Sequence, residues 1–357
     1  MNTAPSDLVS SFTSDSFKMK KVWLLIDSLA FGGIETHVFE LANGLKKFDI
    51  DVSVVFIAHY GQQALLADKL EKASISYFYL NHSFPSSSVY QSLKQAILKH
   101  QPNLIHAHGY KASIYSRLAR KLIHDGPFKQ ISTFHAGETP KGKVWLYDFI
   151  DRYSAFFSDA RLSVSQLIKR KLPSHSYTLN NFIDTTNIDC AKGSQIAFVG
   201  RLSHEKAPDR FLNLAIINPE HEFHCYGSGP MECDLISRCP NNLTLHGHQS
   251  NMESIWKNVD LLVIPSRYEG LPMAGLEAMA RGIPLLCTNV GDLNELMEHQ
   301  NNGFIVDYEG DLQQQLQLWL LMSECDKQKI RHAAKQTIEQ HYSTKSVLPQ
   351  LLDIYQI

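Results

Sequence analysis

Short apolar runs alternate with longer segments of helical character along almost the whole chain. Runs that are apolar throughout are typical of strands in parallel sheets, because helices cover both faces of such sheets. The pattern occurs twice, and 357 residues exceed the size at which a single core stops growing. The sequence therefore predicts an α/β protein with two doubly wound, Rossmann-like domains.

The expected strands divide evenly between the two halves of the chain. In the first half they are Val22–Ile26, Val52–Ile57, Ile75–Leu80, Leu104–His108, Ile131–His135 and Ala160–Val164. In the second half they are Ile196–Val199, Glu222–Tyr226, Leu243–His246, Leu261–Ile264, Pro284–Cys287 and Phe304–Val306.

Composition shifts suggest where the domains begin and end. Residues 1–18 are rich in Ser, Thr and Asp without periodicity, so we expect a disordered extension. A polar stretch after Asp184 predicts a linker, with the boundary near residue 190. The domains would then be 19–190 and 191–340, and residues 341–357 are expected to form a helix that packs back on the first domain.

Bulk properties exclude several classes of protein. No apolar run is long enough to cross a bilayer and no signal pattern begins the chain, so we expect a cytoplasmic location. The six cysteines lack C-x-x-C or zinc-ligand spacing, which favours reduced, mostly buried thiols. Residues 1–190 carry 21 Lys and Arg against 16 Asp and Glu, whereas residues 191–357 carry 13 against 20, which suggests different partners for the two halves.

The loops that follow strands are the places to look for chemistry, because ligands bind at the carboxyl ends of strands in doubly wound sheets. In the first such loop, Gly32 and Gly33 stand at the mouth of a helix, where free amides and the helix dipole favour a phosphate. A tight strand-to-helix turn explains an isolated glycine pair equally well. The spacing departs from G-x-G-x-x-G, which argues against a nicotinamide or flavin dehydrogenase.

Histidines end two of the expected strands. His106 and His108 share one face of their strand, and His135 ends the next. A histidine at this position can reach a bound ligand as a hydrogen-bond partner or base. Most of the 17 histidines will have structural roles, but position favours His108 and His135.

Two cations follow the strand that ends at Gly200. Arg201 and Lys206 can neutralise a diphosphate that gains charge as it leaves, without a metal. The competing interpretation for Lys206 is a surface pair with Glu205 or Asp209.

The loop after Leu261–Ile264 enters a helix near Pro272 and places two carboxylates beside the free amides of its first turn. Those amides favour an anion, so Glu269 and Glu277 are expected to accept hydrogen bonds from the neutral hydroxyl groups of a sugar. Capping by Glu269 and solvation of Glu277 are the alternatives. The apolar neighbours of Glu277 weaken the second, because a carboxylate among them needs a partner.

With these loops in hand, the chain from about residue 21 to its end resembles the retaining GT-B glycosyltransferases, specifically glycosyltransferase family 4. Glu269–Glu277 matches the family's E-x7-E motif, and Gly200–Leu202 with Lys206 matches its G-R-L-x3-K signature. Gly32–Glu35 resembles the glycine loop of the first domain, and Thr133–His135 resembles the strand end that carries the catalytic-region histidine. The resemblance implies a GT-B fold, in which the two domains face each other across a cleft.

The resemblance also implies a role for each matching residue. Glu277 would bind the ribose and Glu269 the donor sugar, while Arg201 and Lys206 would hold the diphosphate and His135 would lie near the anomeric carbon. The further donor-binding residues implied are Gly32, Gly33, Gly227, Gly247, His248, Gly270, Leu271, Pro272 and Met273.

Such a protein would move a hexose or N-acetylhexosamine from a nucleotide-sugar, with UDP favoured, to a saccharide or lipid-linked acceptor in cell-envelope polysaccharide, lipopolysaccharide or glycolipid synthesis. The resemblance implies retention of configuration and no metal or other cofactor, and nothing suggests nucleic acid as a partner. A GT-B phosphorylase or epimerase, or a non-catalytic nucleotide-sugar-binding protein, would share the fold. The D-x-D letters at Asp49–Asp51 precede a strand, so a polar turn is the better interpretation than the metal site of a GT-A enzyme.

Acceptor binding is expected in the first half of the chain, with His108, Tyr110 and Lys111 as candidates. Tyr110–Lys121 and Gln166–Leu172 mix Lys and Arg with apolar residues. Stretches of this kind can rest on an anionic membrane, although ordinary surface helices look the same. Peripheral membrane contact is therefore a hypothesis at this point.

Overall fold

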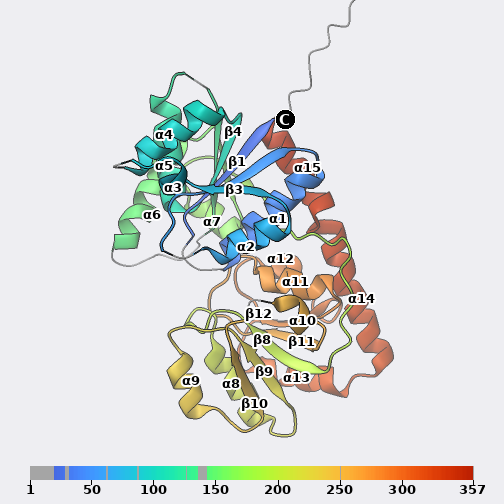
Figure 1. Cartoon of the computed structure of the whole chain (residues 1–357). Helices are drawn as coiled ribbons and strands as arrows, with labels where there is room; N and C mark the ends of the chain where they lie inside the picture. Colours follow the sequence, from blue (N-terminus) through green and yellow to red (C-terminus); the bar gives the residue numbers. More distant parts are fainter. Residues whose placement is uncertain are drawn as a thin grey trace, which may run out of the picture.

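The computed structural model describes residues 20–28, 32–61, 63–86, 88–125, 127–135, 143–249 and 251–356, and it contains two α/β domains built on separate parallel sheets (Figure 1). The extension expected for residues 1–18 lies outside the described residues. Each sheet is fully parallel and buried between helices, which is why its strands are apolar on both faces.

The first domain has a seven-stranded sheet with the order β3-β2-β1-β4-β5-β6-β7. The strands are β1 (Lys21–Ile26), β2 (Asp51–Phe56), β3 (Ser76–Tyr79), β4 (Leu104–His108), β5 (Lys129–Phe134), β6 (Ala160–Ser163) and β7 (Tyr177–Thr178). The helices are α1 (Gly33–Lys47), α2 (Leu65–Lys72), α3 (Leu80–Ser83), α4 (Val89–His100), α5 (Tyr110–Leu122), α6 (Lys143–Tyr153), the 3₁₀ turn η1 (Ala155–Phe157) and α7 (Gln166–Lys171). The order reverses beside β1, so the carboxyl ends of β1 and β4 form the expected binding edge.

The second domain has a six-stranded sheet with the order β10-β9-β8-β11-β12-β13. The strands are β8 (Gln195–Val199), β9 (Phe223–Tyr226), β10 (Leu243–Gly247), β11 (Val259–Ile264), β12 (Leu285–Thr288) and β13 (Gly303–Val306). The helices are α8 (Pro208–Ile217), α9 (Glu232–Arg238), α10 (Met252–Trp256), α11 (Met273–Ala280), α12 (Leu293–Leu296), α13 (Asp311–Leu321) and α14 (Glu324–His341). Here the order reverses between β8 and β11, whose following loops carry the predicted cations and carboxylates.

Every strand expected from the sequence is present, with bounds that differ by a residue or two. The sequence missed β7, which has only two residues and pairs with β6 at the edge of the sheet. A strand this short has no periodic pattern to recognise.

The chain returns to the first domain at its end. Helix α14 stops at a break around Tyr342, and Ser343 caps α15 (Thr344–Tyr355) by accepting a hydrogen bond from the Ser346 amide. Val347, Leu348, Leu351 and Tyr355 of α15 pack into the core of β1, β2 and α1. Figure 1 shows α14 beside the second domain and α15 beside the first.

One expectation about the cysteines is wrong. All six thiols are free, but only Cys225 and Cys287 are buried, whereas Cys190, Cys233 and Cys325 are exposed. Exposure of these three follows from their places on surface segments rather than in strands. Among the described helices, none combines the length and the apolar character needed to cross a bilayer.

Candidate donor-binding site

The loop after β11 holds the side chain of Glu269 almost fully buried at the carboxyl ends of the strands of the second sheet. Its side chain is 4% exposed, and Ser266 donates to Oε1 over 2.8 Å. The carbonyl of Ser266 in turn accepts a hydrogen bond from the Thr288 hydroxyl over 2.6 Å, which ties the loop to the end of β12. The carboxylate is therefore held in one orientation before any ligand binds.

Lys206 binds this carboxylate rather than its own surface neighbours. Its Nζ lies 2.7 Å from Oε1 and 2.6 Å from Oε2 of Glu269. Asp209, one of the alternative partners, instead forms a two-pronged ion pair with Arg267. The surface-pair interpretation of Lys206 is thus wrong, because the loop after β8 bends toward the loop after β11.

The same pairing joins the two loops into one unit. The Arg267 amide donates to the carbonyl of Glu205 over 2.7 Å, so backbone and side-chain contacts both hold the lysine beside the glutamate. The charge pair therefore comes from the loops that follow β8 and β11, two strands that are distant in sequence but adjacent in the sheet.

Arg201 and the glycines around it line the neighbouring edge. Arg201 is exposed, and the amide of Gly227 donates to the carbonyl of Gly247 over 2.8 Å, which brings the ends of β9 and β10 together. Gly227 has a φ of +141°, and a Cβ there would lie 1.8 Å from the carbonyl oxygen of Gly200. Only glycine allows this approach. His248, also a predicted donor contact, is exposed beside Gly247.

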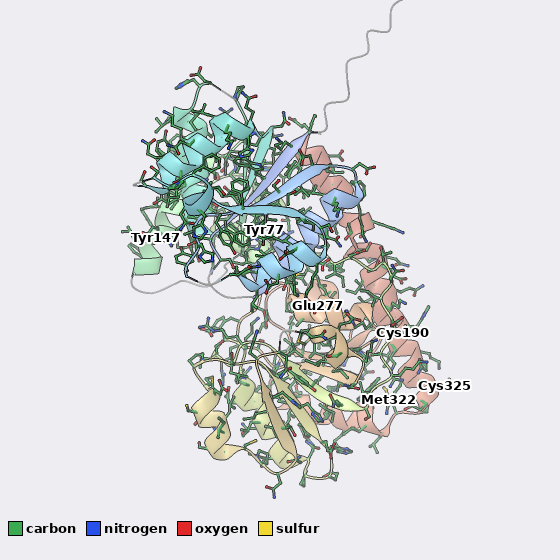
Figure 2. All side chains as sticks on the ribbon, in the orientation of Figure 1. Tyr77, Tyr147, Cys190, Glu277, Met322 and Cys325 are labelled. Carbon is green, nitrogen blue, oxygen red and sulfur yellow. The ribbon has the colours of Figure 1, made fainter. Side chains whose placement is uncertain are left out.

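Helix α11 carries the second carboxylate of the motif. The helix begins at Met273 with Pro272 as its N-cap, one residue later than the sequence suggested. Glu277 accepts a hydrogen bond from the indole nitrogen of Trp256 over 3.0 Å. Burial raises the pKa of Glu277, although the nearby Arg281 acts in the opposite direction. Figure 2 shows Glu277 where the two domains meet, so it is not simply solvated.

Three histidines face this edge from the first domain. His108, at the end of β4, lies 3.0 Å from His135 between Nδ1 and Nε2, and the ring of His37 lies 4.9 Å from that of His135. Burial lowers the pKa of all three, to about 4 for His37. The fourth nearby histidine, His106, is held by Tyr355 and Thr133 at 2.6 Å each, which is a structural role.

The three imidazoles also have the spacing of a metal-binding group. Their ligand nitrogens lie within 4.8 Å of one another, the only such group among the residues that the structure describes. Neutral imidazoles of this kind suit Zn²⁺ or a similar ion. The expectation that the reaction needs no metal is therefore open to test.

Direct contacts join the domains at the site. The side-chain amide of Asn181 donates to the carbonyl of Leu271 in the donor loop over 2.7 Å, and also contacts His37. The amide of Gln166 donates to Asp292 over 3.1 Å. The predicted glycine loop is described from Gly32, and a Cβ at Gly33 would have no atom of the described residues within 4 Å.

The predicted acceptor residues lie at the carboxyl edge of the first sheet. Lys111 forms an ion pair with Asp27 over 2.8 Å, and Tyr60 donates to the same carboxylate over 2.6 Å. Tyr110 begins α5 and lines a small cavity of about 50 Å³ with His135. His108 is fully buried in the histidine group at the end of β4, whereas the side chain of Lys111 is 39% exposed.

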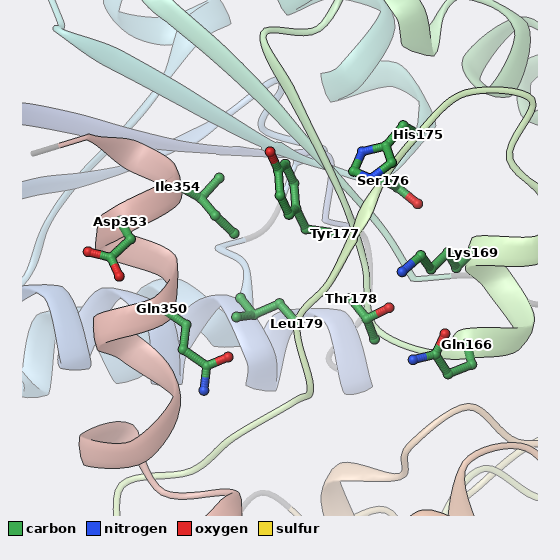
Figure 3. Close-up of a pocket in the computed structure, with 10 residues that line it drawn as sticks. All are labelled: Gln166, Lys169, His175, Ser176, Tyr177, Thr178, Leu179, Gln350, Asp353 and Ile354. Atoms are coloured by element: carbon green, nitrogen blue, oxygen red, sulfur yellow. The ribbon is translucent and has the colours of Figure 1, made fainter.

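A larger cavity of about 450 Å³ lies elsewhere, between α7, β7 and α15 (Figure 3). None of the predicted donor or acceptor residues lines it. Size therefore does not mark the site here, and the buried charge pair does.

Sequence reasoning missed the residues that position the site: Ser266, Thr288, Trp256, Asn181 and Gly291. Gly291 has a φ of +62°, and a Cβ there would lie 2.3 Å from the carbonyl oxygen of Glu269. A polar residue three positions before Glu269 was the one local signal available. The rest are contacts between segments far apart in sequence.

The histidine group predicts a dependence of stability on pH. Because burial lowers the pKa of His37 from 6.5 to about 4, the unfolded chain binds protons more readily than the folded one. Stability should therefore fall as the pH drops from 6.5 toward 4, by about 3 kcal/mol from His37 alone. Urea unfolding of the wild type and of His37→Gln at both ends of this range checks the effect. The variant should lose less stability, and equal losses would remove His37 as a cause.

Comparison with known proteins gives a consistent picture. Residues 31–186 match the model of Glycosyltransferase Family 4, and residues 193–320 match that of Glycosyl transferases group 1. The chain is 26% identical to the O-antigen biosynthesis glycosyltransferase WbnH of Escherichia coli over 348 residues, covering 92% of this chain and 99% of the relative. It is also 26% identical to the UDP-Gal:alpha-D-GlcNAc-diphosphoundecaprenol alpha-1,3-galactosyltransferase of the same organism, over 60% of this chain and 65% of the relative.

Among solved structures, Anabaena HepE in complex with UDP-glucose superposes with a TM-score of 0.79. The sequence identity is 16%, and the match covers 94% of this chain and 99% of that one. This likeness shows the GT-B fold. The two family matches, which cover residues 31–186 and 193–320, show that the chain belongs to glycosyltransferase family 4 (group 1) and is a glycosyltransferase.

Proposed function

We propose that the protein transfers a hexose or N-acetylhexosamine from a UDP-sugar, with retention of configuration and without a metal, to a saccharide or lipid-linked acceptor. The observation that carries the proposal is the buried Glu269 carboxylate paired with Lys206 at the carboxyl edge of the second sheet. A carboxylate at 4% exposure beside a helix N-terminus is suited to binding hydroxyl groups, since phosphate would be repelled.

The roles follow from position. Arg201 is exposed at the edge and Lys206 is 34% exposed, so both can reach a diphosphate and stabilise the charge that develops as it leaves. The amides at the start of α11 add to this, and Glu277 is placed to accept hydrogen bonds from a ribose. His135, neutral at pH 7 because burial lowers its pKa, would contact the donor sugar rather than repel a cationic transition state.

Relatives support the choice of substrates. HepE was solved with UDP-glucose, and one relative's name specifies a UDP-galactose donor and an undecaprenol-linked acceptor. Another is named for O-antigen biosynthesis. We therefore assign the reaction to cell-envelope polysaccharide synthesis, at the cytoplasmic face of a membrane that the protein contacts peripherally.

Nucleotide release in the presence of a chelator tests the proposal. The purified protein is incubated with UDP-, GDP- and TDP-sugars, and slow release of UDP is expected to exceed that of the other two nucleotides. Arg201→Ala should lower kcat/KM by about 10- to 100-fold, since it removes a charge-assisted contact to the diphosphate. Arg238→Ala, which removes another exposed arginine of the same domain from α9, serves as the control.

Other outcomes separate the alternatives. Loss of turnover in chelator would contradict metal independence and point to the three histidines. Tight UDP binding without any turnover would indicate a non-catalytic binding protein. Turnover that requires inorganic phosphate would indicate a phosphorylase.

A further inference from the structure

Large apolar side chains cover the outer side of α6 and η1. They are Trp145, Leu146, Tyr147, Phe149, Ile150, Tyr153, Phe156 and Phe157, between 40% and 61% exposed, and we call them the α6 face. Neighbouring rings contact one another, with centroids 5.5 Å apart for Trp145 and Phe149. Figure 1 shows α6 on the flank of the first domain away from α14 and α15, and Figure 2 shows Tyr147 there. A patch of this extent marks an interaction surface.

Helix α6 has the opposite distribution of polar and apolar side chains to an ordinary surface helix. Its inner side carries Asp148 and Asp151, both buried. Asp151 pairs with the buried Arg117 of α5 over 2.8 Å, and Asp148 pairs with Arg152 over 2.7 Å. The Asp151–Arg117 pair thus holds the helix to α5, and the Asp148–Arg152 pair lies within α6, while aromatic groups face outward, the reverse of the usual pattern. The ion pairs also neutralise the acidic residues of this helix.

The positive charge of the segment around the α6 face favours an anionic membrane over a protein as its binding partner. Residues 110–172 contain 12 Lys and Arg against 5 Asp and Glu, in a chain whose net charge is −2. A third aspartate of this segment, Asp159, pairs with Arg120. Lys121 lies over the ring of Phe157, 4.1 Å from its centroid. An aromatic surface within a strongly basic segment is complementary to the headgroup region of an anionic bilayer.

The face is also joined to the candidate site. The inner residues Asp148, Asp151 and Arg152 line the same small cavity as His135 and Tyr110. A single helix therefore separates the apolar face from the catalytic edge of the first domain. An acceptor anchored in a bilayer would reach the site by passing around this helix.

We propose that the α6 face inserts into the interfacial layer of an anionic membrane and so presents the site to a lipid-linked acceptor. The delivery of the acceptor rests on the proposed function, whereas the insertion does not. The basic segment supplies long-range attraction, and the aromatic side chains supply the buried apolar area.

Tryptophan fluorescence tests insertion directly, because Trp145 is 48% exposed while Trp23, Trp256 and Trp319 are 1% exposed or less. Vesicles of phosphatidylglycerol with brominated acyl chains should quench the Trp145 emission, and Trp145→Phe should abolish that quenching. Vesicles of phosphatidylcholine should quench much less. Emission that is unchanged by the phosphatidylglycerol vesicles would overturn the proposal. It is the result expected if the α6 face binds a protein rather than a membrane.

A vesicle flotation assay provides the second measurement. Phe149→Ser with Phe156→Ser should weaken binding to phosphatidylglycerol vesicles by about tenfold or more, because two partly inserted rings are lost. The matched control is Ile217→Ser with Ile236→Ser, which removes side chains of 58% and 60% exposure from the second domain. Equal binding by both double variants would overturn the proposal.

The two proposals can fail separately. UDP release from the Phe149→Ser, Phe156→Ser variant, assayed without vesicles, should equal that of the wild type. Membrane insertion without UDP release in the wild type would leave the α6 face assigned and remove the proposed function. UDP release without insertion would do the reverse.

Discussion

Replacing Glu269 with Gln is expected to lower kcat/KM for nucleotide-sugar turnover by about 10²- to 10³-fold, the loss typical of one preorganised polar group in an active site. The carboxylate is 4% exposed and holds both Lys206 and Ser266, so the substitution changes the charge and the orientation of the site at once. The size of the side chain is unchanged. Steady-state release of UDP from a UDP-sugar measures the effect.

The fold should survive this change, because Lys206 is 34% exposed and can be solvated when its partner is neutral. Glu309→Gln is the matched control, since it breaks an ion pair with Arg210 in the same domain without touching the buried loop. An unchanged kcat/KM in Glu269→Gln would contradict the site assignment. A similar loss in both variants would show that the effect is not specific to the site.

Replacing Arg117 with Met is expected to lower the free energy of unfolding by about 3–5 kcal/mol, because it leaves the Asp151 carboxylate buried without its partner. Arg117 is 2% exposed and Asp151 4%, and the guanidinium also donates to the Ser158 hydroxyl over 2.8 Å. Burial raises the pKa of Asp151 to about 6 even with Arg117 present. The loss of unfolding free energy in Arg117→Met should therefore be smaller in acid, where Asp151 is protonated and uncharged.

Urea denaturation checks this prediction with two further variants. Arg120→Met lies one turn along the same helix and breaks a half-exposed pair with Asp159, so it should cost less than about 1 kcal/mol. Adding Asp151→Asn to Arg117→Met should restore part of the loss, since no buried charge then remains unpaired. Equal destabilisation by Arg117→Met and Arg120→Met would show that burial of the pair is unimportant.

Much of the fold could be predicted because its signals are local. A strand such as Val22–Ile26 is buried on both faces, so it is apolar in sequence wherever it lies in the sheet. The break between α14 and α15 is likewise local, with Ser343 as the cap. Strand β7 could not be found, because two residues carry no periodicity.

The candidate site was only half visible. Glu269, Arg201 and Lys206 stand in recognisable loops, but the partner of Lys206 was ambiguous, since Glu205 and Asp209 are nearer in sequence. Arg267 resolves the ambiguity by taking Asp209. The α6 face was missed entirely, because its aromatic residues look like core residues until the helix is seen to turn its aspartates inward.

The sequence by itself determined the two parallel sheets and the loops that end their strands, because burial on both faces leaves a repeated apolar pattern. Only the tertiary structure decided which side chains meet: Lys206 with Glu269, His37 with His108 and His135, and Arg117 with Asp151. Such pairs depend on strand order and on the direction in which each helix face points. Neither property leaves a pattern in neighbouring residues.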